Sequence, residues 1–258
     1  RQMPAHLTPD GRAAVVVVRP LAALVHDTLL AAGCELLAQA RGGDHWVTHF
    51  RGGTAVPPEP PADPLAPYVR GQFSFKVGQT SYQLTAVYNL PEFDTLSHDT
   101  RLAISTLRGE RVAGRVLVWN PGQGHVPVYL RQRFGRQIAH YVLAGRDLLS
   151  LHVSAHNLRA HGVPEAHITR LHLPHLLAVR GPFDWAVVFP DADAGVPWAE
   201  RLLPGCAGWL GENGRLLLTT RSTFAHRLLA QPHPFRKRQD RKRHGYRTLL
   251  LQLTAPAL

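Results

Sequence analysis

The sequence predicts an α/β fold: a doubly wound, mainly parallel sheet with a small N-terminal α+β segment. Three observations support this. Strands and helices alternate from Arg115 to the end of the chain. A short apolar strand, Val116–Trp119, runs into the glycine-containing turn Asn120–Gly124, where a ligand can approach the backbone. The 258 residues are 45% hydrophobic and 18% charged with no apolar run of 18 residues, so we expect a soluble protein without a membrane span.

The first 53 residues predict a β-α-β-β segment. The β-branched run Ala13–Arg19 favours a buried strand, and Leu21–Ala32 has the apolar spacing of a helix. Cys34–Gln39 and His45–Phe50 read as two strands joined by a tight turn. The segment is small for an independent domain, so it is either the tail of a larger one or an appendage.

Residues 54–67 predict a linker, because their prolines disfavour both helix and central strand. Residues 68–258 then form the second domain. It opens with a hairpin, Gln72–Val77 and Ser81–Val87, followed by a helix that Ser97 or Asp99 caps and that ends at Leu107. The later strands are expected at Val116–Trp119, Gln137–Leu143, Phe183–Phe189, Leu216–Thr219 and Tyr246–Leu253. The later helices are expected at Pro127–Phe134, Leu148–His161, Val196–Leu210 and Thr223–Leu229.

The net charge of +11 favours a polyanionic partner such as nucleic acid, although a bias toward Arg over Lys could produce it without a binding role. The charge is densest in a predicted loop, Arg236–Arg247. This loop is either an RNA contact that binds phosphates or a solvated hairpin tip. Its candidate RNA-binding residues are Arg236, Lys237, Arg238, Arg241, Lys242 and Arg243.

Several chemistries find no support in the sequence. Cys34 and Cys206 lack metal-ligand spacing and are expected to be buried thiols of a cytoplasmic protein. His152 and His156 share a predicted helix face, but the sequence between them is not that of a metalloprotease, and we expect no metal site. No nucleophile elbow and no phosphate-binding Walker loop occur, so no sequence motif indicates a hydrolase or an NTPase.

Five segments in this order resemble those of class I S-adenosylmethionine-dependent methyltransferases. The chain is most similar to the bacterial small-subunit (16S) ribosomal RNA guanine methyltransferases, over Gln72–Leu253. That family has two methyltransferase-like domains in tandem, the first without cofactor binding, so the resemblance implies that residues 1–53 end a degenerate domain. The segments are Val116–Gly124, Ser154–Val163, Phe183–Pro190, Trp209–Leu218 and Tyr246–Arg247.

The resemblance implies that S-adenosylmethionine binds at Asn120, Gly122 and Gly124, with Asn120 in place of the first glycine of the family's loop. The carboxylate that normally bonds the ribose hydroxyls aligns with Gly145. Asp147, two residues later, is the candidate to take over that role.

The family's Asn-Pro-Pro-aromatic motif, which positions the target amine, aligns with Phe189–Ala192, and only Pro190 is kept in place. Asp191 or Asp193 could accept hydrogen bonds from the amine instead, or both are ordinary loop residues. Trp185 or Trp198 could stack on the base, or both pack in the core.

Two functions therefore stay open. The first is methyl transfer to a guanine exocyclic amine of ribosomal RNA, with Asp191 and Pro190 as the catalytic candidates. The second is RNA binding by a non-catalytic relative that has lost the cofactor and base-positioning motifs.

Overall fold

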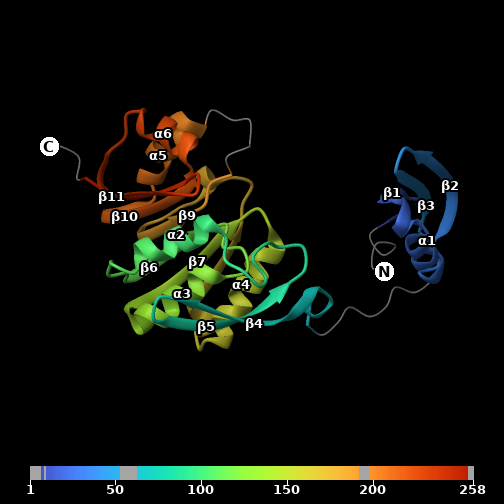
Figure 1. Cartoon of the computed structure of the whole chain (residues 1–258), viewed down its shortest axis with the longest axis horizontal. Helices are drawn as coiled ribbons and strands as arrows, with labels where there is room; N and C mark the ends of the chain where they lie inside the picture. The colour runs from blue at the N-terminus through green and yellow to red at the C-terminus, as the bar shows by residue number, and fades with distance from the viewer. Residues whose placement is uncertain (1–6, 9, 53–62, 192–197, 255–258) are drawn as a thin grey trace. The chain divides into compact units, whose positions relative to one another are not determined.

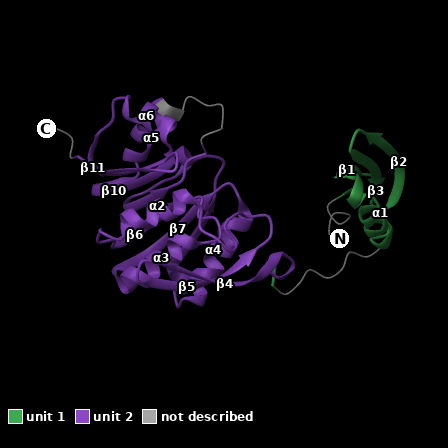
Figure 2. Cartoon of the chain, viewed as in Figure 1, with its two compact units in different colours: residues 1–64 green, residues 65–258 purple. Residues whose placement is uncertain are grey.

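The computed structural model describes residues 7–8, 10–52, 63–191 and 198–254. It divides into two compact units, Arg1–Pro64 and Leu65–Leu258 (Figure 2). The division falls inside the segment predicted as a linker. Leu65 is buried against Val87 and Val153, so the end of that segment packs with the second unit.

The first unit has the predicted order β-α-β-β. Its three strands form an antiparallel sheet in the order β1-β3-β2, and α1 packs on one face around Leu29, Cys34 and Phe50. The elements are β1 (Arg12–Val18), α1 (Ala22–Ala31), β2 (Glu35–Gly42) and β3 (His45–Arg51).

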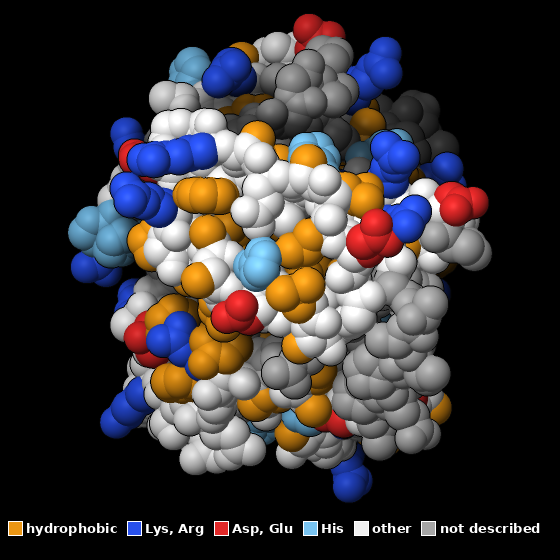
Figure 3. Space-filling model, turned by 90° about the vertical axis from the view of Figure 1, so that its right-hand side faces the viewer, with side chains coloured by type: hydrophobic (Ala, Val, Ile, Leu, Met, Phe, Trp, Pro, Cys, Tyr) orange, Lys and Arg blue, Asp and Glu red, His pale blue; other side chains and the backbone are white. Residues whose placement is uncertain are grey.

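This small unit leaves large apolar side chains in solvent. Val16 is 61% exposed and Leu24 63% exposed. Hydrophobic side chains among Lys and Arg are also visible on the face of the molecule drawn in Figure 3. Short sheets with one covering helix bury little surface, so such exposure is expected of a unit of this size.

The second unit is built on a seven-stranded sheet in the order β11-β12-β10-β9-β6-β7-β8. The five strands from β10 to β8 are parallel, while β12 is antiparallel to both β10 and β11. The predicted doubly wound sheet is therefore confirmed. The strands are β6 (Gly114–Trp119), β7 (Ile138–Gly145), β8 (Ile168–His172), β9 (Phe183–Val188), β10 (Leu210–Arg221), β11 (Phe235–Arg243) and β12 (Tyr246–Leu253).

Helices cover both faces of this sheet. The helices α2, α3 and α4 pack on one face, where α2 and α3 are seen crossing the strands in Figure 1, and α5 and α6 pack on the other. The hairpin of β4 (Val69–Val77) and β5 (Thr80–Val87) joins the first of these layers. No helix among the described residues is long and apolar enough to cross a membrane. The helices are α2 (His98–Leu107), α3 (His125–Phe134), α4 (Leu148–Ala160), α5 (Trp198–Ala207) and α6 (Ser222–Leu229).

The prediction of a basic loop at Arg236–Arg247 is wrong in its secondary structure. Most of that segment is the edge strand β11, and only the turn at His244 and Gly245 separates it from β12. Its backbone pairs with the buried strand β12, which compensates for side chains that have no strand pattern of their own. The edge strand β8 was also not predicted.

Candidate functional site

Two adjoining hollows lie where β6, β7 and β9 end. Their volumes are about 550 and 420 Å³. Asn120, Asp147 and Asp191 line both, and each follows a different one of these strands. This is the edge at which open parallel sheets bind ligands. A molecule that occupied both hollows would contact these three side chains where the hollows meet.

The loop after β6 holds three residues in the left-handed backbone region. The φ angles are 55° at Asn120, 58° at Gly122 and 95° at Gly124. Asn is one of the few residues besides Gly that adopts this region readily, so Asn120 keeps the turn that a glycine would make. At Gly124 a Cβ atom would lie 3.1 Å from the Cα of Ser154, so glycine is required there.

Side-chain hydrogen bonds hold this loop against α4 and β5. The hydroxyls of Ser150 and Ser154 donate to the Gly122 carbonyl at 3.1 and 3.0 Å. The buried Gln123 amide donates to the Val87 carbonyl at 3.0 Å and accepts from the Val87 N–H at 3.1 Å. The loop is thereby fixed to α4 and to the end of β5.

Asn157 on α4 completes this network. Its Nδ2 donates to the carbonyls of Gln123 and Thr85, both at 2.9 Å, and its Oδ1 accepts from the Thr85 N–H at 2.9 Å. One buried amide therefore joins α4, β5 and the loop through hydrogen bonds.

His125, the first residue of α3, is buried and bonded on both ring nitrogens. Its Nε2 lies 2.8 Å from the Glu92 carbonyl, which can only accept, so we assign the proton to Nε2. Nδ1 then accepts from the Tyr82 hydroxyl at 3.3 Å. Burial lowers the pKa of His125 and raises that of Tyr82, so both groups are neutral near pH 7.

Asp147 is the N-cap of α4. Its Oδ1 accepts from the Ser150 N–H at 3.1 Å, and Oδ2 makes no hydrogen bond to any described residue. Gly145, the position aligned with the ribose carboxylate, ends β7, and a Cβ there would lie 3.0 Å from Asn120 Oδ1. Asp147, in the segment between β7 and α4, is thus an acidic side chain that lines both hollows.

Asp191 lies just past β9 and faces the loop after β6. Asn120 Nδ2 donates to Asp191 Oδ1 at 3.1 Å and to the Phe189 carbonyl at 2.9 Å. Arg146 Nε is 4.0 Å from Asp191 Oδ2, a weak surface ion pair. These contacts join the segments that follow the three strands.

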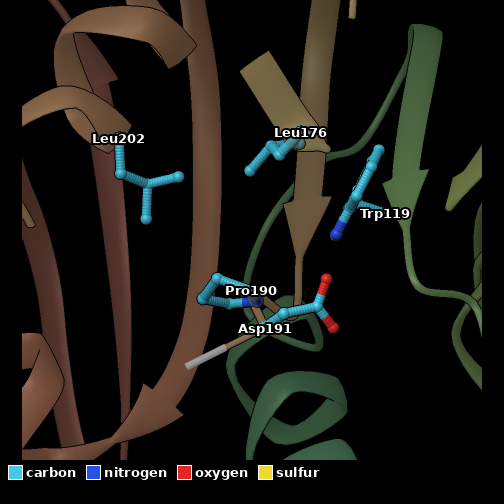
Figure 4. Close-up of a pocket in the computed structure, with 5 residues that line it drawn as sticks. All are labelled: Trp119, Leu176, Pro190, Asp191 and Leu202. Atoms are coloured by element: carbon cyan, nitrogen blue, oxygen red, sulfur yellow. The ribbon is translucent and has the colours of Figure 1, made fainter. Parts of the chain in front are cut away.

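Pro190 faces a smaller void of about 10 Å³, between Leu176 and Leu202 (Figure 4). The nitrogen end of the Trp119 ring points toward the Asp191 carboxylate across this void, and Trp119 Nε1 is buried without a hydrogen-bond partner among the described residues. The space is about that of one water molecule, which could join the two groups.

Polar groups at the start of α2 line the 420 Å³ hollow on its other side. Ser97, one of the two predicted candidates, is the N-cap of α2 and accepts from the Thr100 N–H at 3.3 Å. Glu92 accepts from the Ser97 N–H at 2.8 Å and from the Thr100 hydroxyl at 3.2 Å. The Ser97 hydroxyl also contacts Glu92 and Asp99 closely.

The aromatic side chains considered for stacking on a base lie in different places. Trp185 is 4% exposed and packs in the core, which is the second of the two alternatives that the sequence left open for it. Tyr246 and Phe189 instead are the aromatic side chains that line the 420 Å³ hollow. Asp193 and the side chain of Trp198 lie outside the described residues.

The basic residues predicted to bind RNA are exposed along β11. Asp240 among them accepts from Arg247 at 2.6 Å and from Lys237 at 3.0 Å. Hydrogen bonds from Arg247, together with Lys237, lower the pKa of Asp240 to about 2. Lys237 and Arg247 are therefore already paired with the Asp240 carboxylate.

Metal and thiol chemistry gain no support from the described part of the chain. It contains no group of three or more His, Cys, Asp or Glu side chains that could hold a metal ion. Cys34 and Cys206 are buried free thiols, as predicted, and burial raises the pKa of both.

No protein-family model and no curated protein matches this sequence. Solved structures do match. The 16S rRNA methyltransferase RsmC of T. thermophilus, in complex with AdoMet (S-adenosylmethionine) and guanosine, is 19% identical with a TM-score of 0.65, covering 95% of this chain and 65% of its own. A SAM-dependent methyltransferase-like protein of Streptococcus mutans is 13% identical with a TM-score of 0.52, covering 70% and 55%. TrmN of Thermus thermophilus is 17% identical with a TM-score of 0.50, covering 90% and 66%.

At these identities the likeness shows the fold. The second unit has the fold of class I S-adenosylmethionine-dependent methyltransferases, as the sequence predicts. The chain spans between 55% and 66% of the length of these three proteins.

Proposed function

We propose that the protein binds S-adenosylmethionine at the carboxyl ends of β6 and β7 and methylates a guanine exocyclic amine in ribosomal RNA. The observation that carries the proposal is the pair of adjoining hollows at the loop Asn120–Gly124. The similarity to a structure that holds both AdoMet and guanosine supports the choice of cofactor and base. The two buried thiols favour a reducing cytoplasm as the compartment.

The residues present fit this cofactor. The hollows, of about 550 and 420 Å³, lie within the size range of small-molecule sites. Gly122 lines the 420 Å³ hollow without a side chain of its own, and Gly124 packs against Ser154 and keeps the turn of the loop. Asp147 Oδ2 is available to accept hydrogen bonds from ribose hydroxyls. We therefore assign Asn120, Gly122, Gly124 and Asp147 to the cofactor.

When bound, S-adenosylmethionine supplies an electrophilic methyl group on a positively charged sulfur. The protein then has mainly to hold the amine in the right orientation, because this chemistry needs little proton transfer. We assign that role to the Asp191 carboxylate and the Pro190 carbonyl, which can accept the two amine N–H bonds. Asp191 is well suited, since it lines both hollows.

A second candidate function, RNA binding without methyl transfer, follows from Phe189. Its side chain cannot accept a hydrogen bond, and Asp191 is already bonded to Asn120 at 3.1 Å. A protein in which these two features prevent amine positioning would bind RNA through the same fold without transferring a methyl group.

The experiment that separates the two candidates uses tritiated S-adenosylmethionine and transcribed fragments of small-subunit ribosomal RNA. We expect label in the RNA with the natural protein, located at guanine after nuclease digestion. RNA binding without any incorporated label would favour the second candidate.

The first unit completes the proposal. We propose that residues 1–53 are the tail of a degenerate methyltransferase-like domain and that residues 54–67 link it to the domain 68–258. Expression of residues 65–258 alone tests this: it should fold cooperatively and retain cofactor binding.

A further inference from the structure

The strand β11 divides its basic side chains between two faces, because paired residues of an antiparallel sheet lie on the same face. Arg243 pairs with Tyr246, and Arg241 pairs with Thr248. The Arg241 guanidinium donates to the Ser105 carbonyl of α2 at 3.3 Å, which identifies this as the face covered by α2. Arg241 and Arg243 therefore lie on the side of the candidate site.

The opposite face carries Lys237, Lys242 and Arg247, with Asp240 between them. Asp240 binds Lys237 and Arg247 there, so part of this charge is neutralised within the hairpin. On the α2 face, Arg241 and Arg243 have no carboxylate partner among the described residues. The two faces thus differ in their capacity to bind an anion.

Aromatic and imidazole rings gather where the α2 face meets the 420 Å³ hollow. Tyr246 lines the hollow, and the Arg221 guanidinium lies 4.6 Å from the centre of its ring. The turn residue His244 stacks on His98 at the start of α2, with ring centres 4.2 Å apart and planes at 26°. Arg243 Nε donates to His244 Nε2 at 3.2 Å.

We propose that these residues hold a single-stranded stretch of RNA around the target base. We refer to His98, Arg221, Arg243, His244 and Tyr246 as the hairpin mouth. In this arrangement Tyr246 stacks on the base that enters the hollow, and the imidazole pair stacks on a neighbouring base. Arg221 and Arg243 bind the phosphates between them. The inference rests on the proposed function and adds to it the form of the RNA and its direction of approach.

Two physical arguments select a single strand. Rings can stack on a base only after it has left its own helix, and every base offers the same flat face to an aromatic ring. Guanidinium groups beside those rings give the backbone a fixed path of positive charge. A duplex would present phosphates to Arg243 but no base face to Tyr246.

The test compares two substitutions that remove one charge each from adjacent positions on opposite faces. Arg243→Ala and Lys242→Ala are measured in the full chain by fluorescence anisotropy with a labelled 15-nucleotide single-stranded RNA that contains one central guanine. We expect Arg243→Ala to weaken binding about 5- to 20-fold and to reduce the log–log salt slope by about 0.7, the value for one phosphate contact to a single strand. Lys242 is among the residues that the sequence predicts to bind RNA, but it lies on the face opposite α2, so in this proposal Lys242→Ala should change affinity less than about twofold.

Tyr246 tests the stacking step. Tyr246→Ala should weaken binding about 5- to 100-fold, the range of base–aromatic stacking, while Tyr246→Phe keeps the ring and should bind within about twofold of the natural protein. Thermal melts of both variants show whether the protein stays folded. If Tyr246→Ala unfolds, Tyr246→Phe still tests the inference, because a folded variant that keeps the ring must bind like the natural protein.

Equal losses from Lys242→Ala and Arg243→Ala, or unchanged affinity in a folded Tyr246→Ala, would overturn the inference. Titration of the same proteins with S-adenosylmethionine distinguishes this failure from that of the proposed function. Retained cofactor binding with no preference between the two faces removes only the hairpin mouth, whereas absent cofactor binding in the natural protein removes the proposed function itself.

Discussion

The loop after β6 and the segment after β9 meet at the same edge of the sheet but are held very differently. Ser150, Ser154 and Asn157 of α4 donate to the backbone of the first, and its own Gln123 side chain bonds the Val87 backbone at the end of β5. The second is tied to the site chiefly through the single side chain of Asn120. The difference indicates that the loop proposed to bind the cofactor has a firmly held backbone, while the segment proposed to position the amine is held by few contacts.

Removing the strongest tie of the cofactor loop should have the largest effect. In Gln123→Leu the N–H and C=O of Val87 and the carbonyl of Leu90 lose their buried partner. We expect unfolding free energy in urea to fall by about 3–5 kcal/mol, at about 1–3 kcal/mol for each unsatisfied group. The exposed Gln83→Leu on β5 is the control and should change it by under about 0.5 kcal/mol. A loss below about 1 kcal/mol would show that the loop is not held by Gln123.

The segment after β9 should respond in activity rather than in stability. Asp191→Ala removes the proposed acceptor, so we expect methyl transfer to RNA to fall about 100-fold or more through loss of positioning. The Kd for S-adenosylmethionine should stay within about twofold. Asp94→Ala, at an exposed carboxylate, is the control. Unchanged transfer by Asp191→Ala would remove Asp191 from the reaction.

Asp147 allows its capping role to be separated from cofactor binding. Asn caps helices as well as Asp does, so Asp147→Asn should fold normally but bind S-adenosylmethionine about 10- to 100-fold more weakly, because a charged acceptor is lost. Asp147→Ala should show the same affinity and, in addition, lose about 1 kcal/mol of stability. Titration calorimetry and thermal melts measure the two effects. If Asp147→Asn bound S-adenosylmethionine with unchanged affinity, Asp147 would not be the residue that binds the ribose hydroxyls.

The smallest effect should come from pH. Burial lowers the pKa of His125 in the folded chain, so the unfolded chain binds the extra proton first. The contribution of neutral His125 to stability is complete above the unfolded pKa of about 6.5 and is lost as the pH falls below it toward the lowered folded value. Urea midpoints at pH 7.5 and 5.5 should differ less in His125→Phe than in the natural protein. Equal pH dependence in both would assign the effect to other groups.

The sequence was sufficient for most of the fold, because periodic apolar runs identify buried strands and helices without knowledge of their partners. It failed at β11, where the residues Arg236–Arg243 are all polar and strand formation depends on pairing with Leu249–Leu251 of β12. It also failed at β8, a short edge strand whose apolar residues Ile168 and Leu171 are three positions apart and so lack the alternating pattern of a strand.

The candidate site was predictable only in part. Asn120, Gly122 and Gly124 stand out because a glycine turn after a strand is a local pattern. Gln123 and Asn157 do not, because their bonding partners lie 33 to 72 positions away in the chain. Tyr246 reaches the hollow only because β12 inserts between β10 and β11, and no local signal reveals this placement.

Isothermal titration of the natural chain, residues 1–258, with S-adenosylmethionine tests most directly whether the proposed cofactor site functions. We expect saturable heat with one site per chain and a Kd of about 1 μM to 1 mM, the range usual for enzyme ligands. Absence of heat at millimolar ligand, with protein that melts cooperatively, would contradict the assignment of this site to the cofactor and leave the RNA-binding candidate in its place.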